Sequence, residues 1–418
     1  MKKRLLAGLL AAAMTFGLVA CGGSGSKPES TQADSSEDLV EVHVIAAQYG
    51  QNTAEWWSNF VGDFEKDNPG IHLDVEVVSW NDIYTVVNTR IANGEAPDVL
   101  NIDVFADYQA DNLLLPIQDV VSEETYAKMF PAFLEQSEVD GTVWAVPDLA
   151  SARALYYNKD IFEKAGIEVP TTWDELTAAC EALKKYDANI YPWGIDMTTD
   201  EGQAAFAYYT WNNGGGFVDA DGNWTINSDA NVEAVKYAVD LVNKGYTNSD
   251  PANDTRYDLQ DMFGAGQLAM VIAPNSLPTY CKDGGYEVNY GVAAIPNNTG
   301  ASVSAGVMDR FMCFDNEYDD AKKEAITKFF DYFYDDARYS DWVLMEGFLP
   351  ATQAGAEAMV AADPEQASWI EILDSCQFYP TAKAEWADVK QGVIDVEQQA
   401  LLGGDVKELL DNLQNELQ

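Results

Sequence analysis

The feature that most constrains this chain is the repeated exchange of strand-type and helix-type hydrophobic patterns from Leu39 onward. In the segment 71–77, apolar residues alternate with polar ones, which is the period of a strand with one buried face. In the segment 53–68, apolar residues recur three and four positions apart, which is the period of a helix that buries one face. Strands separated by helices favour open, mainly parallel sheets that are covered on both faces. The sequence therefore predicts an α/β fold.

Three later segments carry helix-boundary signals of their own. Thr172 and Glu175 form a capping box ahead of an apolar stripe. The valines within 232–242 repeat at helical spacing, and Gly245 is expected to end that helix. Near the end of the chain, Asp405 supplies another N-terminal cap. These signals predict helices as far as the C-terminal segment.

The length of 418 residues is too great for one compact domain. At roughly 100–200 residues per domain, it favours two lobes that each bury a core of their own. In open α/β sheets, ligands bind beyond the carboxyl ends of the strands. The loops expected at those ends are rich in amides, carboxylates and hydroxyls, and they cover residues 48–53, 101–103, 196–201 and 273–276.

The N-terminal segment has the pattern of an exported lipoprotein. Basic residues precede an apolar run over 5–20, as in a secretory signal peptide, which we assign to 1–20. At about 16 residues, the run is shorter than the roughly 20 apolar residues that a spanning helix needs. The motif LVAC at 18–21 resembles the lipobox of bacterial lipoproteins, so we expect acyl chains on Cys21 and a flexible linker over 21–38. This predicts anchoring at the extracytoplasmic face of the cell membrane.

The charge of the chain limits its partners. With 24 basic and 69 acidic residues, the formal charge is −45. Such a charge repels phosphate backbones, so no nucleic-acid partner is expected. The two histidines, His43 and His72, give no basis for a histidine-ligated metal site. We expect neither a metal nor a cofactor.

No known catalytic motif accounts for an activity. HExxH, GxSxG, P-loop and dinucleotide-binding patterns do not occur in the chain. A glycoside hydrolase needs only two carboxylates at a set separation, and 69 acidic residues supply such pairs by chance. The segment 219–223 (DADGN) looks like the start of a calcium loop, but Ala230 occupies the twelfth position, where that loop needs glutamate, so a hairpin turn is predicted instead. We therefore expect no catalytic residues.

Four cysteines remain once Cys21 is assigned to lipid. They are widely spaced, and no CxxC pattern occurs among them. Two disulfides and four single thiols are both compatible with an exported protein, so the choice stays open. The four are Cys180, Cys281, Cys313 and Cys376.

A series of short motifs follows in a fixed order along the chain. They are GEAPDV at 94–99, ALYYNKD at 154–160 with TWDEL at 172–176, FGAGQLAM at 263–270, GVAAIP at 291–296 and GFLPA at 347–351. In sequence and order, these motifs resemble the family of carbohydrate-binding proteins that serve ATP-driven importers, which includes the maltose-binding proteins. The resemblance extends over about 41–418.

This resemblance implies the two-lobed periplasmic-binding-protein fold (type II-like), with a ligand cleft between lobes joined by hinge crossovers. It places the first lobe at 39–149 plus 291–340 and the second at 150–290 plus 341–418. It also implies a monomer that closes on a carbohydrate ligand and delivers it to the permease subunits of an ABC importer in the membrane.

The same resemblance suggests several ligand-binding residues. Asp103 follows a strand at a place where family members have a ligand-binding carboxylate. Tyr208 and Trp211 precede paired glycines in a segment that lines the family's cleft, and Trp386 stands where the family has a stacking tryptophan. Asn275 replaces a tryptophan of many relatives, which favours a hydrogen-bonding contact. The other candidates are strand-end polar or aromatic residues and two charged residues, namely Gln48, Asn52, Trp56, Trp80, Arg310 and Glu346.

The leading hypothesis is a lipid-anchored receptor for a neutral mono- or oligosaccharide. One alternative is a surface-anchored glycoside hydrolase, and another is a binding protein for a non-sugar solute such as a peptide or a polyamine. A receptor would leave its sugar intact, whereas a hydrolase would release reducing ends.

Overall fold

The structure is a computed structural model that describes residues 39–367, 369 and 376–417. All described residues belong to one compact unit, Leu39–Gln418. The predicted signal peptide, the linker and the lipidation site Cys21 lie outside the described residues. Within the described residues, every helix is too short or too polar to cross a membrane.

One end of the main sheet consists of three parallel strands in the order β2-β1-β3. The alternation in the segment 71–77 forms β2 as predicted, with Ile71 and Leu73 buried and His72 exposed. The helical pattern in 53–68 forms α1, which buries Trp57 among other aromatic residues. The elements of this part are β1 (Val40–Ala47), α1 (Thr53–Asp67), β2 (Ile71–Val78), α2 (Ile83–Ala92), β3 (Val99–Ile102), α3 (Ala106–Ala110), η1 (Ile117–Asp119), α4 (Glu123–Tyr126), α5 (Pro131–Glu135), and a separate hairpin of β4 (Glu138–Val139) and β5 (Thr142–Val143).

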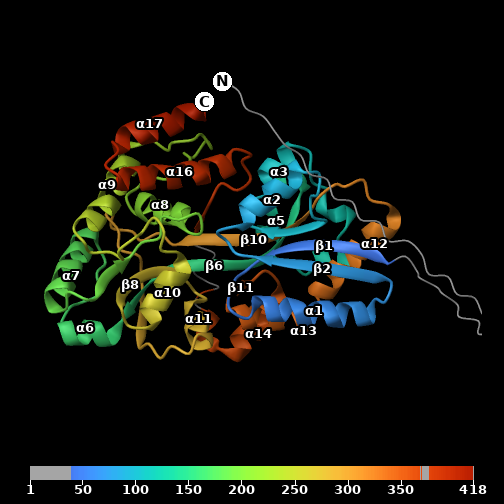
Figure 1. Cartoon of the computed structure of the whole chain (residues 1–418), viewed down its shortest axis with the longest axis horizontal. Coiled ribbons are helices and arrows are strands. Elements are labelled where there is room, and N and C mark those ends of the chain that lie inside the picture. Colours follow the sequence, from blue (N-terminus) through green and yellow to red (C-terminus); the bar gives the residue numbers. More distant parts are fainter. Residues whose placement is uncertain (1–38, 368, 370–375, 418) are drawn as a thin grey trace, which may run out of the picture. The chain divides into compact units, whose positions relative to one another are not determined.

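A single long strand, β6 (Ala145–Asn158), joins the two ends of the sheet (Figure 1). Its first half pairs antiparallel with β10 (Ala305–Cys313), which in turn pairs with β3. Its second half, from Arg153, pairs antiparallel with β8 (Leu268–Pro274) and β9 (Tyr290–Ala293). The sheet is therefore mixed rather than mainly parallel, because the chain passes between its two ends along antiparallel strands and not through crossover helices.

The other end of the sheet carries β8 and β7, which are parallel. The capping box of Thr172 and Glu175 is present and begins α7 as predicted. The valine segment forms α9, and Gly245 follows it with the positive φ expected of a helix-ending glycine. The elements are α6 (Lys159–Ala165), α7 (Trp173–Tyr186), β7 (Tyr191–Gly194), α8 (Gly202–Trp211), α9 (Asp229–Asn243), α10 (Arg256–Gly264) and α11 (Leu277–Asp283).

The last part of the chain contacts both ends of the sheet. Trp342 of α13 packs against Trp56 and Trp57 of α1, while α16 packs against α8 and α17 against α9. Asp405 caps α17 as predicted. The exact division of the chain between two lobes stays a prediction. The elements are α12 (Asp320–Phe333), α13 (Asp336–Glu346), β11 (Leu349–Pro350), α14 (Gln353–Ala362), η2 (Pro364–Gln366), β12 (Gln377–Phe378), α16 (Trp386–Leu401) and α17 (Val406–Glu416).

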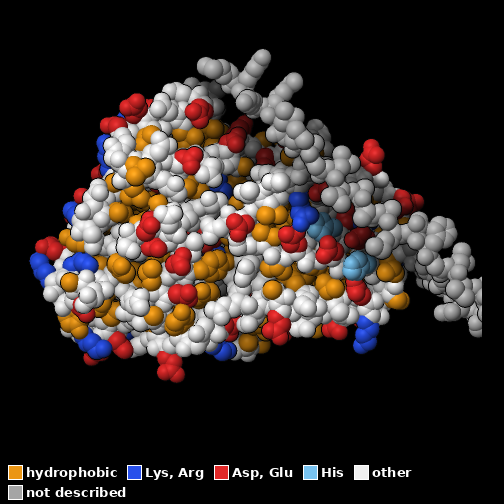
Figure 2. All heavy atoms as spheres, viewed as in Figure 1, with side chains coloured by type: hydrophobic (Ala, Val, Ile, Leu, Met, Phe, Trp, Pro, Cys, Tyr) orange, Lys and Arg blue, Asp and Glu red, His pale blue; other side chains and the backbone are white. Residues whose placement is uncertain are grey.

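Two open questions from the sequence are answered by local structure. All four cysteines within the described residues are free thiols, so no disulfide joins them. The DADGN segment is a hairpin turn as predicted: Val218 bridges to Trp224, and the carboxylate of Asp219 accepts backbone hydrogen bonds within the turn. Acidic side chains are spread over the face of the molecule that Figure 2 shows, with fewer basic ones between them.

Candidate ligand-binding cleft

A cavity lies at the centre of the sheet, where β6 passes from one end to the other. It has a volume of about 370 Å³ including the space at its mouth. Three of the polar strand-end loops expected from the sequence, 48–53, 101–103 and 196–201, border the cavity directly. The fourth loop, 273–276, borders an adjoining space. The cavity is lined by Tyr49, Trp80, Tyr84, Asp103, Ser151, Arg153, Asp200, Glu201, Gln203, Arg256, Val307, Asp309, Phe348 and Lys390.

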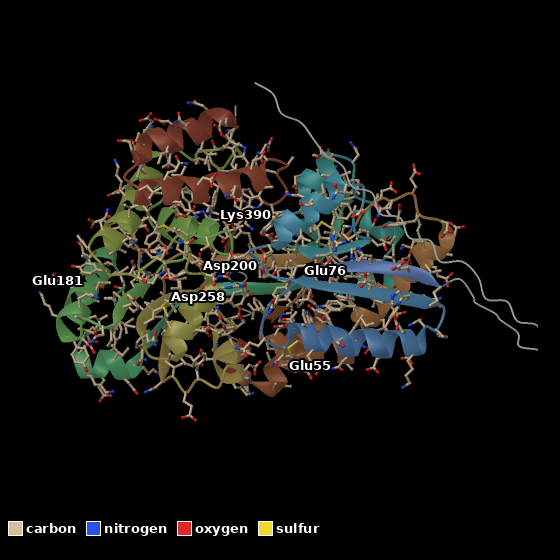
Figure 3. All side chains as sticks on the ribbon, viewed as in Figure 1. Glu55, Glu76, Glu181, Asp200, Asp258 and Lys390 are labelled. Atoms are coloured by element: carbon tan, nitrogen blue, oxygen red, sulfur yellow. The ribbon has the colours of Figure 1, made fainter. Side chains whose placement is uncertain are left out.

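An ion pair between Asp103 and Lys390 spans this cavity. Lys390 Nζ of α16 lies 2.9 Å from Asp103 Oδ2, at the end of β3. The hydroxyl of Tyr84 donates a hydrogen bond of 2.7 Å to Asp103 Oδ1, and the Lys390 ammonium also contacts that hydroxyl. In Figure 3, Lys390 and Asp200 lie in the middle of the molecule, whereas Glu181 lies at its periphery. The pair therefore connects the β3 end of the sheet with the C-terminal helices.

A second buried network forms another part of the cavity wall. Arg153 Nη2 lies 2.8 Å from Glu201 Oε1, and Arg153 Nε donates to the Tyr208 hydroxyl at 3.0 Å. That hydroxyl donates to Glu201 Oε1 at 2.9 Å. Burial raises the pKa of Glu201, but the charges of Arg153 and Arg256 outweigh it and hold the pKa below its usual value. Glu201 is therefore a fixed negative charge in this wall.

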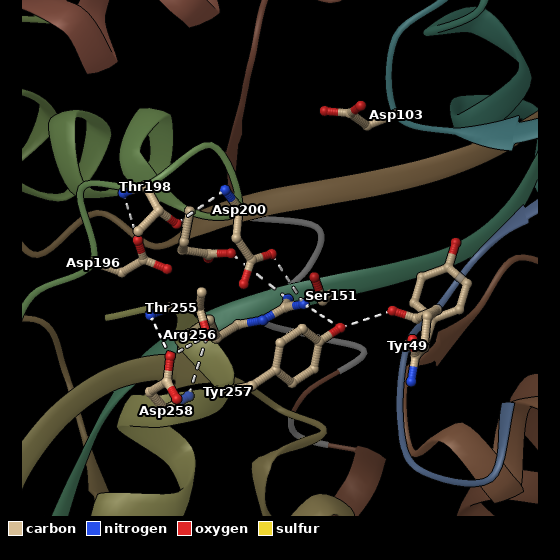
Figure 4. A network of polar contacts seen from close by, with 12 residues as sticks. Tyr49, Asp103, Ser151, Asp196, Thr198, Asp200, Thr255, Arg256, Tyr257 and Asp258 are labelled. Carbon is tan, nitrogen blue, oxygen red and sulfur yellow. Dashed lines mark hydrogen bonds and ion pairs between the residues drawn. The ribbon is translucent and has the colours of Figure 1, made fainter. Parts of the chain in front are cut away.

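Arg256 extends this network across the cavity (Figure 4). Its Nη2 lies 3.4 Å from Asp200 Oδ1, and its Nη1 lies 3.6 Å from Glu201 Oε2. It also donates to the hydroxyl of Tyr257, and that hydroxyl donates to the backbone carbonyl of Gln48 at 2.7 Å. A chain of polar contacts thus joins α10 to the loop that follows β1.

Several polar atoms of the cavity lack hydrogen-bond partners. Within the described residues, these atoms include Asp309 Oδ1, Gln203 Oε1, both carboxylate oxygens of Asp200 and Arg256 Nε. A buried polar atom without a partner costs about 1–3 kcal/mol. Because these unsatisfied atoms belong to the lining of one cavity, a ligand with matching hydroxyl or amine groups would satisfy them.

The buried carboxyl of Asp309 is electrostatically unusual. Burial, followed by the negative charge of Asp103, raises the pKa of Asp309 to about 7. Burial likewise raises the pKa of Glu346 to about 7. Glu346 lines an adjoining space together with Asn52 and Ser276. The candidate site therefore holds carboxyl groups that change protonation near neutral pH.

The structure places the sequence-predicted residues in different surroundings. Asp103 and Trp80 line the central cavity, and Asn52 and Glu346 line the adjoining space. Tyr208 supports the cavity wall through Arg153, as described above. The backbone of Gln48 accepts the Tyr257 hydrogen bond, but its exposed side chain contacts Gly50.

The other predicted residues make internal contacts. Trp56 lies between α1 and α13, where it packs on Trp342 and donates from Nε1 to Asp341 at 3.2 Å. The amide of Asn275 bonds to the backbone of Ala152 and Gly347. Arg310, only 1% exposed, donates to Ser137 Oγ, Thr381 Oγ1 and the carbonyls of Asp103 and Met308.

Trp211 and Trp386 flank a third aromatic residue. The ring of Tyr379 stacks on Trp211 at 5.6 Å and on Trp386 at 5.2 Å. Both tryptophans are almost fully buried, and their indole Nε1 atoms have no hydrogen-bond partner within the described residues. This aromatic stack lies between α8 and α16, beside the wall that Tyr208 supports.

Sequence reasoning missed several residues of the cavity. Asp200 and Glu201 lie in a loop that was expected near a ligand, but neither was singled out. Arg153 gave a usable signal, since it is a charged residue within a buried strand. Asp309 gave a similar signal, because it lies within the mostly apolar strand β10. Lys390 gave none, because a single lysine in a helix is ordinary.

The family of bacterial extracellular solute-binding proteins matches residues 49–338. This chain belongs to that family. A binding protein of Brucella abortus is 30% identical to this solute-binding protein over 374 residues, which cover 88% of this chain and 90% of that protein. The family and the similar structures consist of binding proteins, and this chain is accordingly a binding protein and not an enzyme.

Solved structures support the fold of this solute-binding protein. MalE3 of Thermotoga maritima, solved with maltose, is similar with a TM-score of 0.79 and 21% identity over 91% of this chain and 99% of that chain. A solute-binding protein of Thermotoga lettingae, solved with α-D-tagatose, has a TM-score of 0.80 and 19% identity over 90% of this chain and 98% of that chain. The chain thus has the two-lobed α/β fold of periplasmic binding proteins, with a cleft between lobes joined by hinge crossovers.

Proposed function

We propose that this chain captures a mono- or oligosaccharide in its central cavity and delivers it to the permease of an ABC importer. The observation that carries the proposal is the composition of the cavity walls. Sugars have apolar C–H faces surrounded by hydroxyls, so their sites combine aromatic rings with polar side chains. The cavity combines Tyr49, Trp80, Tyr84 and Phe348 with carboxylates, an amide and guanidinium groups.

The ligands of similar proteins support the same class. The Thermotoga maritima protein was solved with maltose and the Thermotoga lettingae protein with α-D-tagatose. These sequences are only distantly related to this chain, so the size and linkage of its own ligand do not follow from them. We propose a carbohydrate ligand on the basis of both the cavity and these relatives.

We further propose that the ligand is held by hinge closure between lobes at 39–149 plus 291–340 and 150–290 plus 341–418. A ligand that touches both lobes favours the closed form, since only that form makes all of its contacts. The Asp103–Lys390 pair and the hydrogen bond from Asn52 to Asp283, at 2.8 Å, link segments assigned to different lobes. Such contacts would stabilise the closed form alongside the ligand.

The anchor is a separate part of the proposal. The LVAC motif supports lipidation of Cys21 and attachment of the monomer to the extracytoplasmic face of the membrane. Acyl chains would keep the binding protein close to its permease.

The direct test is the melting temperature of the purified chain with a panel of mono- and oligosaccharides. A ligand at about 100 times its dissociation constant adds roughly 2.7 kcal/mol to the free energy of unfolding. This should raise the melting temperature by several degrees for one class of sugar. The sugar should be recovered intact. Release of reducing ends with turnover would instead favour a glycoside hydrolase. A rise in melting temperature with peptides or polyamines alone would show that the ligand is not a sugar.

A further inference from the structure

The central cavity has buried hydrogen-bond acceptors that the protein itself does not use. Asp200, Gln203 and Asp309 are 5%, 6% and 6% exposed, and all three carry oxygens without partners within the described residues. On the donor side, Arg256 Nε is buried without an acceptor. A ligand that fits this cavity therefore has to bring several hydrogen-bond donors.

The charges of the cavity distinguish one acid from the others. Asp103 is paired with Lys390, Glu201 with Arg153, and Asp200 lies 3.4 Å from Arg256. In the described part of the chain, no basic side-chain nitrogen lies within 4.0 Å of the Asp309 carboxylate. Asp309 is thus the lining acid without an ion-pair partner.

The neighbouring Arg310 does not fill that role. Its guanidinium is already engaged, because it donates to the hydroxyls of Ser137 and Thr381 and to the backbone carbonyls of Asp103 and Met308. Burial and the charge of Asp103 raise the pKa of Asp309 to about 7, although the charges of Arg310 and Arg153 and a hydrogen bond with Tyr49 oppose the rise. An empty cavity therefore favours a proton on this carboxyl, and a cation of the ligand could take the place of that proton.

The aromatic residues of the cavity suit the same kind of group. Tyr49 lies 5.9 Å from Trp80 and 5.3 Å from Phe348, measured between ring centroids. Aromatic faces close to carboxylates bind ammonium groups through cation–π attraction. The cavity already stabilises one ammonium in this way, because Lys390 Nζ lies 4.1 Å from the ring centroid of Tyr84 and pairs with Asp103.

We propose that the ligand is a small polyhydroxylated molecule with one basic amine, such as an amino sugar, whose ammonium group pairs with Asp309. This inference rests on the proposed sugar-binding function and narrows its substrate class. The hydroxyls of the ligand donate to Asp200 and Gln203, and the amine supplies the cation that Asp309 lacks. A carboxylated or phosphorylated sugar would bring a like charge to Asp309 in place of a cation, so we expect it to bind more weakly than the amino sugar.

The test compares matched sugars that differ in a single group. Calorimetric titration of the full purified chain would use glucosamine, glucose, N-acetylglucosamine and glucuronate, together with the corresponding galactose and mannose series. In at least one series, the amino sugar should bind about tenfold or more tightly than its neutral analogues, which corresponds to 1.4 kcal/mol. Asp309→Asn should abolish this preference for the amino sugar over its neutral analogues. The Asp309→Asn chain should melt cooperatively, since the change is isosteric.

Asp388→Asn is the matched control, because Asp388 is exposed and lines a neighbouring pocket but not the central cavity. It should leave the preference for the amine unchanged. Equal or tighter binding of a neutral or acidic sugar would overturn the amine proposal while the sugar-binding function stands. A preference for the amine that survives Asp309→Asn would overturn the role of Asp309. If neither neutral, amino nor acidic sugars bind, the proposed function fails, and the inference fails with it.

Discussion

The aromatic cluster between α1 and α13 and the central cavity are both buried, but they differ in the contacts of their side chains. In the cluster, Trp57 stacks on Phe333 at 5.7 Å, and Trp56 packs on Trp342 at 4.6 Å. The ring contacts of this cluster are made within the protein, and its one polar atom without a hydrogen-bond partner in the described structure is Nε1 of Trp57. In the cavity, polar oxygens such as those of Asp200 lack hydrogen-bond partners in the described structure. The first region stabilises the fold, and the second leaves interactions for a ligand.

Truncation within the cluster should give the largest loss of stability. Trp57 is 2% exposed and touches six aromatic rings, so Trp57→Ala should lower the free energy of unfolding by about 3–5 kcal/mol. Denaturant unfolding measures this change, with Trp57→Phe as a milder control that keeps an aromatic ring. Ligand affinity, measured on the folded fraction, should not change. A loss of affinity at normal stability would erase the distinction between the two regions.

The ion pair across the cavity should give the next largest effect. Lys390→Met leaves the carboxylate of Asp103 buried without its cation. Breaking a buried ion pair in this way should lower the free energy of unfolding by about 3–5 kcal/mol. The matched control is Lys185→Met, which breaks a pair with Glu181 on the outer surface, where the Lys185 side chain is 73% exposed. The control should leave the unfolding midpoint unchanged. Equal stability of the two variants would show that the cavity pair does not hold the structure together.

The same comparison explains how much the sequence revealed. Local patterns predicted the helices and the strand-end loops, since capping boxes, apolar periods and glycines act over a few residues. Asp103 was named because it directly follows a strand. Its partner Lys390 lies 287 positions away on the apolar stripe of α16, and no local pattern links two such residues. Contacts between distant segments, which build most of the cavity, depend on how the strands are ordered in the sheet.

Aromatic candidates were harder to place for a related reason. A tryptophan that packs in a core and one that stacks on a sugar look alike in a sequence. Trp56 lies off the stripe of its helix, but α13 covers it there. Trp211 and Trp386 are joined by Tyr379, which gave no signal of its own. Only the arrangement of α13, α8 and α16 reveals these surroundings.

The carboxyl of Asp309, which has no ion-pair partner in the described structure, should make the free energy of unfolding depend on pH. The pKa of Asp309 in the folded chain, about 7, lies above the usual value of about 3.9, so the folded state binds a proton that the unfolded state releases. The free energy of unfolding should therefore fall as the pH rises from about 4 to about 7, by at most about 1.4 kcal/mol per pH unit for this group. Asp309→Asn should remove this component.

Urea unfolding at several pH values measures the slope for the original chain and for the variant. Glu346→Gln should reduce the slope in the same direction, because burial also raises the pKa of Glu346 to about 7. The exposed Asp388→Asn should leave the slope unchanged. An Asp309→Asn chain that keeps the full slope would mean that the carboxyl is satisfied and that the cavity resembles the aromatic cluster more closely than we infer.

The smallest effect on either region is expected from Cys21→Ala. The residue lies outside the described residues, whereas the cavity and the aromatic cluster both belong to the compact unit Leu39–Gln418. The variant should therefore keep the stability and the ligand affinity of the original chain. It should nevertheless leave the membrane fraction or remain unprocessed, because the thiol that would carry the acyl chains is absent. Fractionation of cells with and without detergent separates these outcomes, and a variant that still requires detergent for release would refute the lipid anchor while leaving the binding site untouched.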